Sequence, residues 1–271
     1  MAERDEGALQ VWSAEDAVAL RTAKLKLEHP GLAARLADLI GSPIEVVLKR
    51  LPKGWQEKGG DLTQAALMTA LEVALKTLRN KPTKRSRERF HKIAVVGTGG
   101  LGGFFGLSAV AVELPVTTAV ILRSIADIAR SEGHDLSRLN VKLACLEVLA
   151  LGGSRSKDDA AKTGYWAVRT SLARYLEQAA SYVAKGGIGG AKSAPPLVRL
   201  TAAIASRFGV VVEEELAAKA IPVLSAGTGA AVNLAFMNHF QEMARGHFVV
   251  RRLEKKYGTE SVRKAYDELE V

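Results

Sequence analysis

The sequence predicts an all-α fold, a multi-helix bundle without a substantial β-sheet. Hydrophobic residues make up 48% of the 271 residues but aromatic residues only 6%, so the core must be built mainly from Ala, Leu, Val and Gly, which suits closely packed helices. Apolar residues recur at helical spacing along most of the chain, and no stretch alternates like a half-buried strand. Two long glycine- and alanine-rich runs without Asp, Glu, Lys or Arg, 93–112 and 221–241, are expected to be the most apolar helices.

Residues 1–60 are predicted to form an N-terminal helical extension, with helices at 13–28, 32–40 and 44–50. Ser13 is expected to cap the first of them, because its hydroxyl can accept a hydrogen bond from the first turn. Residues 61–271 are predicted to form one helical domain that contains a flexible glycine-rich loop at 186–196. Its helices are expected at 62–80, from Pro115 onward, and at 138–151, 158–185, 196–208, 210–220, 221–241 and 259–270.

Much of the net charge of +9 is concentrated in one segment, 81–92, which carries six cations and a single glutamate. It directly precedes the first uncharged run, where an anionic membrane surface would attract it. No interleaved aromatic residues or recognised nucleic-acid fold accompany it, so a nucleic-acid partner is not expected. The residues predicted to bind anionic lipid are Lys84, Arg85, Arg87, Arg89 and Lys92.

The segment IAVVGTGGLGGFFGL, residues 93–107, contains Gly97, Gly99 and Gly102 in the G-x-G-x-x-G spacing of a dinucleotide-binding turn. Such a turn needs an acidic residue about 20 positions later and further parallel strands. Position 117 is a threonine, and the chain downstream supplies no such strands. No cofactor is therefore expected, although a dinucleotide enzyme stays the third functional hypothesis.

The same glycines also recur four residues apart, which would open a groove on a helix for a neighbouring backbone. Both uncharged runs approach the roughly 20 residues needed to cross a bilayer core. They can be core helices buried in a bundle or helices in contact with a membrane, and the sequence leaves both interpretations open. The predicted helix-packing or membrane-contact residues are Gly99, Gly102, Gly103, Gly106, Gly227, Gly229, Ala231 and Asn233.

Other constellations give no catalytic or metal-binding residue. His239, Met243 and His247 share one predicted helix, but no H-E-x-x-H motif or cysteine cluster accompanies them, so ordinary polar residues are the favoured interpretation. Cys145 lies in an apolar helix and is predicted to be a buried structural thiol. With one cysteine and no apolar signal region after Met1, the expected location is the cytoplasm, at the inner face of the cytoplasmic membrane.

Two blocks of this sequence resemble the EcsC protein family. The first is ELPVTTAVILRSIADIARSEGHDL, in which Glu113, Pro115, Arg123, Ile125 and Gly133 carry the resemblance. The second is AAKAIPVLSAGTGAAVNLAFMNHFQEMARGHFVVRRLEKKYG, with Lys219, Pro222, Gly227, Gly229, Asn233, Ala244 and Leu253. The resemblance spans roughly residues 60 to 260.

The resemblance implies a helical, mostly bacterial protein in a membrane context. The family's namesake is encoded beside the ATPase and membrane subunits of an ABC transporter, and no catalytic activity is established for the family, so no active site is implied. We therefore expect a non-enzymatic, membrane-associated protein of the cytoplasmic face, accessory to a transport or envelope process, with an anionic membrane surface and a membrane protein or transporter as partners. The alternative is a soluble helical protein whose apolar pocket binds a lipid or another hydrophobic ligand.

Overall fold

The structure is a computed structural model, and it describes residues 12–28, 32–41, 46, 55–78, 110–151, 164–186, 194–219 and 226–270. Within these ranges the regular structure is entirely helical, which confirms the predicted all-α fold. The elements are α1 (Ala14–Glu28), α2 (Leu32–Ile40), α4 (Trp55–Thr77), α6 (Val110–Ser131), α7 (Leu139–Glu147), the short 3-10 helix η2 (Val148–Ala150), α9 (Tyr165–Ala184), α10 (Pro195–Lys219), α11 (Ala226–Tyr257) and α12 (Thr259–Glu268).

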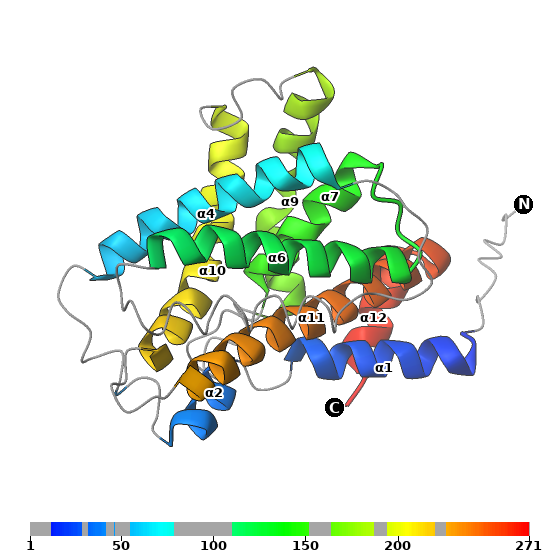
Figure 1. Ribbon diagram of the computed structural model, residues 1–271. Coiled ribbons are helices and arrows are strands. Elements are labelled where there is room, and N and C mark those ends of the chain that lie inside the picture. The colour runs from blue at the N-terminus through cyan, green and yellow to red at the C-terminus, as the bar shows by residue number, and fades with distance from the viewer. Residues whose placement is uncertain are drawn as a thin grey trace, which may run out of the picture.

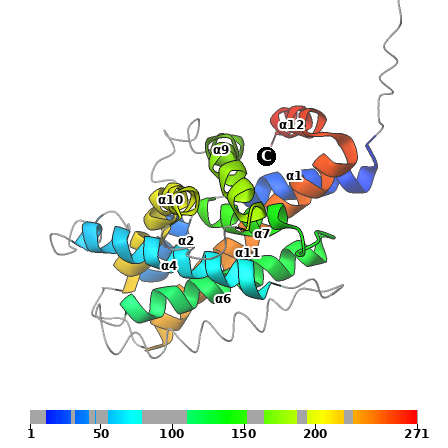
Figure 2. The ribbon, with the colours of Figure 1, turned by 90° about the horizontal axis from the view of Figure 1, so that it is seen from above.

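The helices form a stack with a second set packed behind it. From top to bottom of Figure 1, α4, α6, α11 and α1 follow one another, each in contact with the next. Seen from above, α9 and α10 lie behind α4 and α6 (Figure 2), and α10 contacts α2, α4, α9 and α11. Because α1 and α12 both pack on α11, helices from the two ends of the sequence meet on the same long helix.

Four helices run past the bounds that the sequence predicted: α4 begins at Trp55 instead of 62, α11 continues to Tyr257 instead of ending at 241, and α6 and α10 pass through expected boundaries. α6 begins at Val110, five residues before Pro115, where its start was expected. A proline in the second turn removes only one intrahelical hydrogen bond, so the helix can pass through it. α10 runs unbroken from Pro195 to Lys219, through the break expected at Gly209 and into the end of the predicted 186–196 loop.

The break at Gly209 is absent because this glycine does not adopt the conformation that ends a helix. A helix-terminating glycine takes a positive φ, and Gly209 does not. Phe208, Val211 and Val212 beside it are buried, so the helical path keeps their side chains in the core. Gly133, in contrast, has a φ of +81° and ends α6: its N–H bonds the Arg130 carbonyl, and the next N–H bonds that of Ala129, both at 3.0 Å.

The aromatic part of the core lies where α10 meets α11. Phe208 packs against Phe236 and Phe240 with ring centroids 6.3 and 5.6 Å away, and the latter two rings meet edge to face at 5.2 Å. All three side chains are fully buried, and each contributes about 1.5–3 kcal/mol through burial. Phe236 and Phe240, which belong both to the 221–241 run and to α11, therefore pack against protein.

A different segment has the length and composition of a membrane span. Among the described residues only Pro195–Glu215 of α10 meets that test, and 39% of its most apolar window is buried in the fold. The apolar core helices of water-soluble proteins meet the same test. Residues 93–109 of the first predicted run lie outside the described residues, as do 221–225 of the second.

The closest backbone approach at a described glycine joins α1 to α11. A Cβ placed on Gly246 would lie 2.6 Å from Leu27 Cγ and 3.0 Å from the carbonyl oxygen of Ala23. Real Cβ atoms are essentially never that close to a side-chain carbon, so only glycine fits without displacing α1. A small residue thus brings α1 and α11 together, at a glycine that is not among the predicted packing residues.

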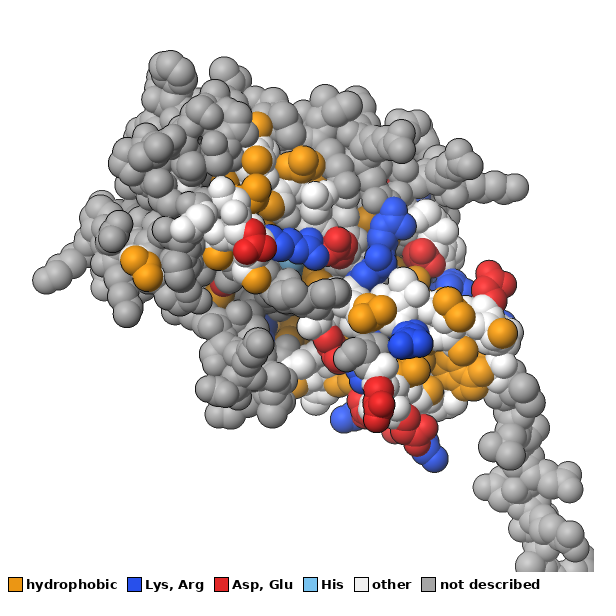
Figure 3. Space-filling model, turned by 90° about the horizontal axis from the view of Figure 1, so that it is seen from below, with side chains coloured by type: hydrophobic (Ala, Val, Ile, Leu, Met, Phe, Trp, Pro, Cys, Tyr) orange, Lys and Arg blue, Asp and Glu red, His pale blue; other side chains and the backbone are white. Residues whose placement is uncertain are grey.

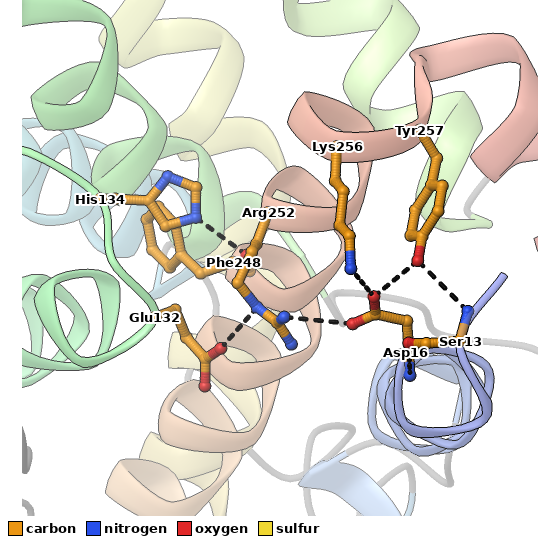
Figure 4. A network of polar contacts seen from close by, with 8 residues as sticks. All are labelled: Ser13, Asp16, Glu132, His134, Phe248, Arg252, Lys256 and Tyr257. Carbon is orange, nitrogen blue, oxygen red and sulfur yellow. Dashed lines mark hydrogen bonds and ion pairs between the residues drawn. The ribbon is translucent and has the colours of Figure 1, made fainter. Parts of the chain in front are cut away.

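A buried carboxylate fastens the start of α1 to the end of α11 (Figure 4). Asp16 accepts hydrogen bonds from Lys256 Nζ at 2.6 Å and Tyr257 Oη at 2.8 Å, and its other oxygen lies 3.3 Å from Arg252 Nη1. Its backbone N–H donates to Ser13 Oγ at 3.2 Å, which confirms Ser13 as the predicted cap. The hydrogen bonds from Lys256 and Tyr257 hold the pKa of Asp16 well below its usual range, so the carboxylate is ionised at neutral pH.

The same end of α11 is also tied to the end of α6. His134 Nε2 donates to the Phe248 carbonyl oxygen at 2.9 Å, and Arg252 Nε lies 3.3 Å from Glu132 Oε2 (Figure 4). The turn at Gly133 places both side chains directly after α6. Arg252 therefore stands between carboxylates of α1 and α6 and links the two helices through α11.

We predict opposite stability changes for two alanine substitutions. Gly246→Ala is expected to destabilise the protein by roughly 1–3 kcal/mol, because the new methyl group must push α1 away from α11. Gly209→Ala, where a Cβ meets nothing within 4 Å, is expected to stabilise it by up to about 1 kcal/mol through helix propensity. Urea unfolding followed by far-ultraviolet circular dichroism measures both, and a Gly246→Ala protein as stable as wild type contradicts the tight crossing.

Asp16→Ala is expected to loosen α1 without unfolding the rest of the chain. The substitution leaves Lys256 and Tyr257 without their carboxylate, a loss of about 1–3 kcal/mol. Hydrogen exchange read by mass spectrometry should show faster exchange in α1 and little change in α10. Glu15→Ala is the matched control, because Glu15 is the exposed neighbour; equal exchange in the two variants would show that the network does not hold α1.

Candidate functional site

A half-open groove of about 380 Å³ lies between α7 and α9 and is closed at one end by α11 and α12. We call it the α7–α9 groove. Its volume is at the lower end of the range for small-molecule sites. The residues that line it are Asn140, Leu143, Ala144, Glu147, Trp166, Arg169, Thr170, Ala173, Leu176, Glu177, Ala180, Arg251, Thr259 and Arg263.

Each wall of the groove is one face of a helix. The α7 residues recur at 140, 143, 144 and 147, and those of α9 recur from 166 to 180 with the same three- and four-residue spacing, which puts each set on one side of its helix. Leu143, Ala144 and Glu147 are buried and form the floor. Small and apolar residues along α9, among them Ala173 and Leu176, extend the groove away from its charged end.

Glu147 is the unusual residue of the floor. Its side chain is 2% exposed, and Oε2 accepts no hydrogen bond from any described residue. The nearest cationic atom is Arg251 Nη1, 3.6 Å away, and His247 Nε2 lies at the same distance. Burial raises the pKa of this carboxyl, and the nearby Arg169 and Arg251 reduce that shift. An acceptor in this position costs free energy until something donates to it.

Tyr165 and His247 lie behind the floor and support it. Tyr165 Oη is 3.2 Å from His247 Nδ1 and accepts from Arg169 Nη1 at 3.3 Å. Burial lowers the pKa of His247 well below its usual value, so the ring is neutral. A phenol proton donated to Nδ1 leaves the ring proton on Nε2, facing Glu147. Both side chains are buried and neither lines the groove.

The three arginines of the groove have different surroundings. Arg169 forms a two-fold ion pair with Glu254, at 2.7 and 3.1 Å, and its guanidinium lies 5.0 Å from the Trp166 ring centroid. Arg251 has its carboxylate contact at 3.6 Å, with Glu147. Arg263 is exposed and lies 5.9 Å from the Trp166 ring, with no carboxylate partner among the described residues. One end of the groove therefore combines cations, an indole ring and a buried carboxyl group.

This arrangement suits binding better than bond-breaking chemistry. A candidate nucleophile and base must reach the substrate, yet Tyr165 and His247 are shielded by the floor. Burial raises the pKa of Cys145 to about 12, as expected of a structural thiol. Within the described ranges no group of three or more His, Cys, Asp or Glu residues could hold a metal ion, and His239, which bonds the Leu151 backbone, is separate from His247.

The sequence-predicted site residues lie elsewhere or outside the described part of the chain. Lys84, Arg85, Arg87, Arg89 and Lys92, and also Gly99, Gly102, Gly103 and Gly106, are outside it. Gly227 and Gly229 belong to the first turns of α11, Ala231 is half-buried, and Asn233 is fully buried. Neither Ala231 nor Asn233 lines the α7–α9 groove, and the packing or membrane role of the whole set stays a prediction.

The groove was not predicted, although the sequence contains one signal for it. Glu147 is the sole acidic residue in the apolar stretch VKLACLEVLAL, and a lone carboxylate among buried residues deserves a functional explanation. Its neighbours could not be found in this way. Trp166, Arg251 and Arg263 come from other helices, and nothing in the spacing of the sequence links them to Glu147.

Comparison with known proteins gives a family and no individual relative. The model of the EcsC protein family matches residues 19–253. The match therefore includes most of α1, all of α2 and nearly all of α11, and it starts well before residue 60, where the sequence resemblance began. No curated protein and no solved structure matches the chain.

The buried histidines predict a protein that loses stability in mild acid. Burial lowers the pKa of His134, of His239 (to about 4) and of His247 from a usual 6.5. Below pH 6.5 these histidines bind protons in the unfolded chain but not in the folded one. The free energy of unfolding therefore decreases as the pH is lowered, until the pKa of the folded state is reached. For His239 alone the loss is on the order of 3 kcal/mol.

Glu147 acts in the opposite direction, because its raised pKa makes acidification favourable for the fold. Urea unfolding at pH 7 and pH 5 should show lower stability at pH 5, and Glu147→Gln should steepen the decline by removing the opposing contribution. Equal stability of the Glu147→Gln variant at both pH values would contradict neutral, buried histidines.

Proposed function

The chain belongs to the EcsC protein family, and from that premise we propose that it is a non-enzymatic helical protein that binds an amphiphilic, lipid-like ligand at the cytoplasmic face of a membrane. The observation that carries the proposal is the α7–α9 groove, with its apolar floor and its charged end. Ligand sites in proteins combine an apolar lining with a few polar groups that fix orientation. This groove has that composition.

The order of groups along the groove matches a molecule with a polar head and an apolar tail. Glu147, Arg251 and Arg263 lie at the end closed by α11 and α12, whereas Ala173, Leu176 and Ala180 continue along α9. Leu143 and Ala144 provide buried apolar surface beneath the ligand. A fully polar ligand would leave this apolar surface in contact with water. A hydrocarbon would leave the charged side chains at the other end without a partner.

Membrane association is supported by a second observation, the basic segment 81–92. On the face seen from below, acidic and basic side chains lie next to one another among hydrophobic ones (Figure 3), so positive charge is balanced locally there. The excess is concentrated in the segment, with six cations against one glutamate. Each cation near an anionic surface contributes about 1 kcal/mol, enough together for reversible attachment.

Filling the groove is expected to abolish binding of an anionic amphiphilic dye. Purified full-length protein should enhance the fluorescence of 1-anilinonaphthalene-8-sulfonate, and a fatty acid should displace the dye. Ala173→Trp places an indole in the groove and should lower dye affinity at least about tenfold. Ala202→Trp, at an exposed position of α10 outside the groove, is the control. Equal affinity of the two variants would place the dye elsewhere and contradict the proposal.

Neutralising the basic segment is expected to release the protein from anionic vesicles. The triple variant Arg85→Gln, Arg87→Gln and Arg89→Gln should sediment less with vesicles containing phosphatidylglycerol, and wild type should behave likewise in high salt, which screens the attraction. A second triple variant removes the same charge from exposed positions on other helices: Arg174→Gln, Arg199→Gln and Lys264→Gln. If both triple variants bind like wild type, the segment does not attach the protein.

A further inference from the structure

We propose that the α7–α9 groove binds a phospholipid-type amphiphile whose headgroup joins an anionic phosphate to a hydrogen-bond donor, such as the ammonium group of ethanolamine. The phosphate lies against Arg251 and Arg263, and the donor binds the carboxyl group of Glu147. This inference rests on the proposed function and adds the chemistry of the headgroup.

Two of the three groove arginines are available to an anion. The guanidinium of Arg169 already donates hydrogen bonds to Glu254 and Tyr165 at distances of 3.3 Å or less. Arg169 therefore serves as part of the wall. Arg251 meets its nearest described carboxylate at 3.6 Å, beyond good hydrogen-bond distance, and Arg263 has none among the described residues. An anionic group that reaches both would gain charge-assisted hydrogen bonds.

Trp166 adds a further donor at the same end. Its indole Nε1 is buried and has no hydrogen-bond partner among the described residues, and the centroid of the ring lies 5.0 Å from the guanidinium of Arg169 and 5.9 Å from that of Arg263. Indole nitrogen can only donate. It therefore favours an acceptor-rich group such as phosphate at this end of the groove.

Glu147 is the reason why the headgroup must carry a hydrogen-bond donor. Its Oε2 is buried, belongs to a residue of the groove floor and accepts no hydrogen bond from the described residues. A ligand with an anionic head and no donor would place like charge beside this carboxyl and leave its oxygen unpaired. A purely cationic ligand would leave Arg251 and Arg263 unneutralised. A headgroup with both charges close together satisfies the two sides at once.

The other groove carboxylate does not disturb this arrangement. Glu177 is exposed and comes eight residues after Arg169 on α9, which is roughly 12 Å along the helix axis. At that distance an exposed charge is largely screened by physiological salt. The apolar side chains of Leu143, Ala173 and Leu176 receive the first part of the acyl chain.

Isothermal titration calorimetry of the delipidated full-length protein tests the headgroup. Three probes are compared below their micelle concentrations: a lysophosphatidylethanolamine, the lysophosphatidic acid with the same chain, which lacks the ammonium, and phosphoethanolamine, which lacks the chain. The wild type should bind the first at least about tenfold more tightly than the second, the gain expected of one hydrogen bond to a charged group. Phosphoethanolamine alone should bind more weakly than the lipid.

Three variants separate the roles of the groove residues. Glu147→Gln should abolish the preference for the ethanolamine lipid, and Arg263→Gln, an exposed change that leaves the core intact, should weaken both lipids. Arg174→Gln, on α9 but outside the groove, should bind like wild type. If the wild type binds the two lipids with equal affinity, the inference is wrong. If it binds phosphoethanolamine as tightly as lysophosphatidylethanolamine, the acyl chain makes no contribution and the ligand is not a lipid. In both cases the proposed function still holds if the protein binds the dye. If the protein binds neither the dye nor any of the three probes, the proposed function is wrong as well.

Discussion

The packing of α11 against helices from both ends of the sequence is the interaction on which the rest of the structure depends. Its 32 residues contact α1, α2, α6, α10 and α12. Polar side chains of α11 also tie it to two of these helices. Gln241 donates to Ser124 Oγ at 2.9 Å, and Glu242 meets Arg35 at 2.5 Å, so the sequence of α11 also fixes where α6 and α2 lie.

The C-terminal half of α11 contacts α1 at two places. Near its middle Gly246 lets α1 approach its backbone, and near its end Asp16, Lys256 and Tyr257 hold the same helix in place. Lys24 strengthens this corner by donating to the carbonyl oxygens of Tyr266 and Leu269 at the end of α12. The N-terminal helix is thus joined to the body of the molecule by buried, charge-assisted hydrogen bonds, which are stronger than contacts between exposed ions.

The α7–α9 groove combines positive charge with polar atoms that have no hydrogen-bond partner among the described residues. Asp16 is a buried carboxylate surrounded by donors, whereas Glu147 Oε2 accepts none from the described residues. The floor behind it is rigid, with Tyr165, His247 and Arg169 connected by hydrogen bonds and by the Glu254 ion pair. Rigid walls and an unsatisfied polar group are what a binding site needs to orient a ligand, and the deep burial of Tyr165 and His247 makes a covalent role for them unsuitable.

The sequence alone determined the local features of this protein. Helical periodicity, the cap at Ser13 and the helix at 32–40 depend on neighbours along the chain and could be predicted. So could the all-α class, since small apolar residues with few aromatics favour packed helices. The family resemblance was likewise present in two blocks of sequence, and the matched family model confirmed it.

Tertiary structure decided what depends on distant residues. Pro115 and Gly209 looked like helix boundaries, yet burial of the residues around Gly209 and the early position of Pro115 in α6 allow both helices to continue. Among the glycines whose surroundings the structure describes, Gly246 is the one that lies against a neighbouring helix, and only the crossing of α1 and α11 decides this. The groove joins side chains of α7, α9, α11 and α12, and only the folded chain brings Glu147 within 3.6 Å of Arg251, because no local propensity encodes a contact between residues a hundred positions apart.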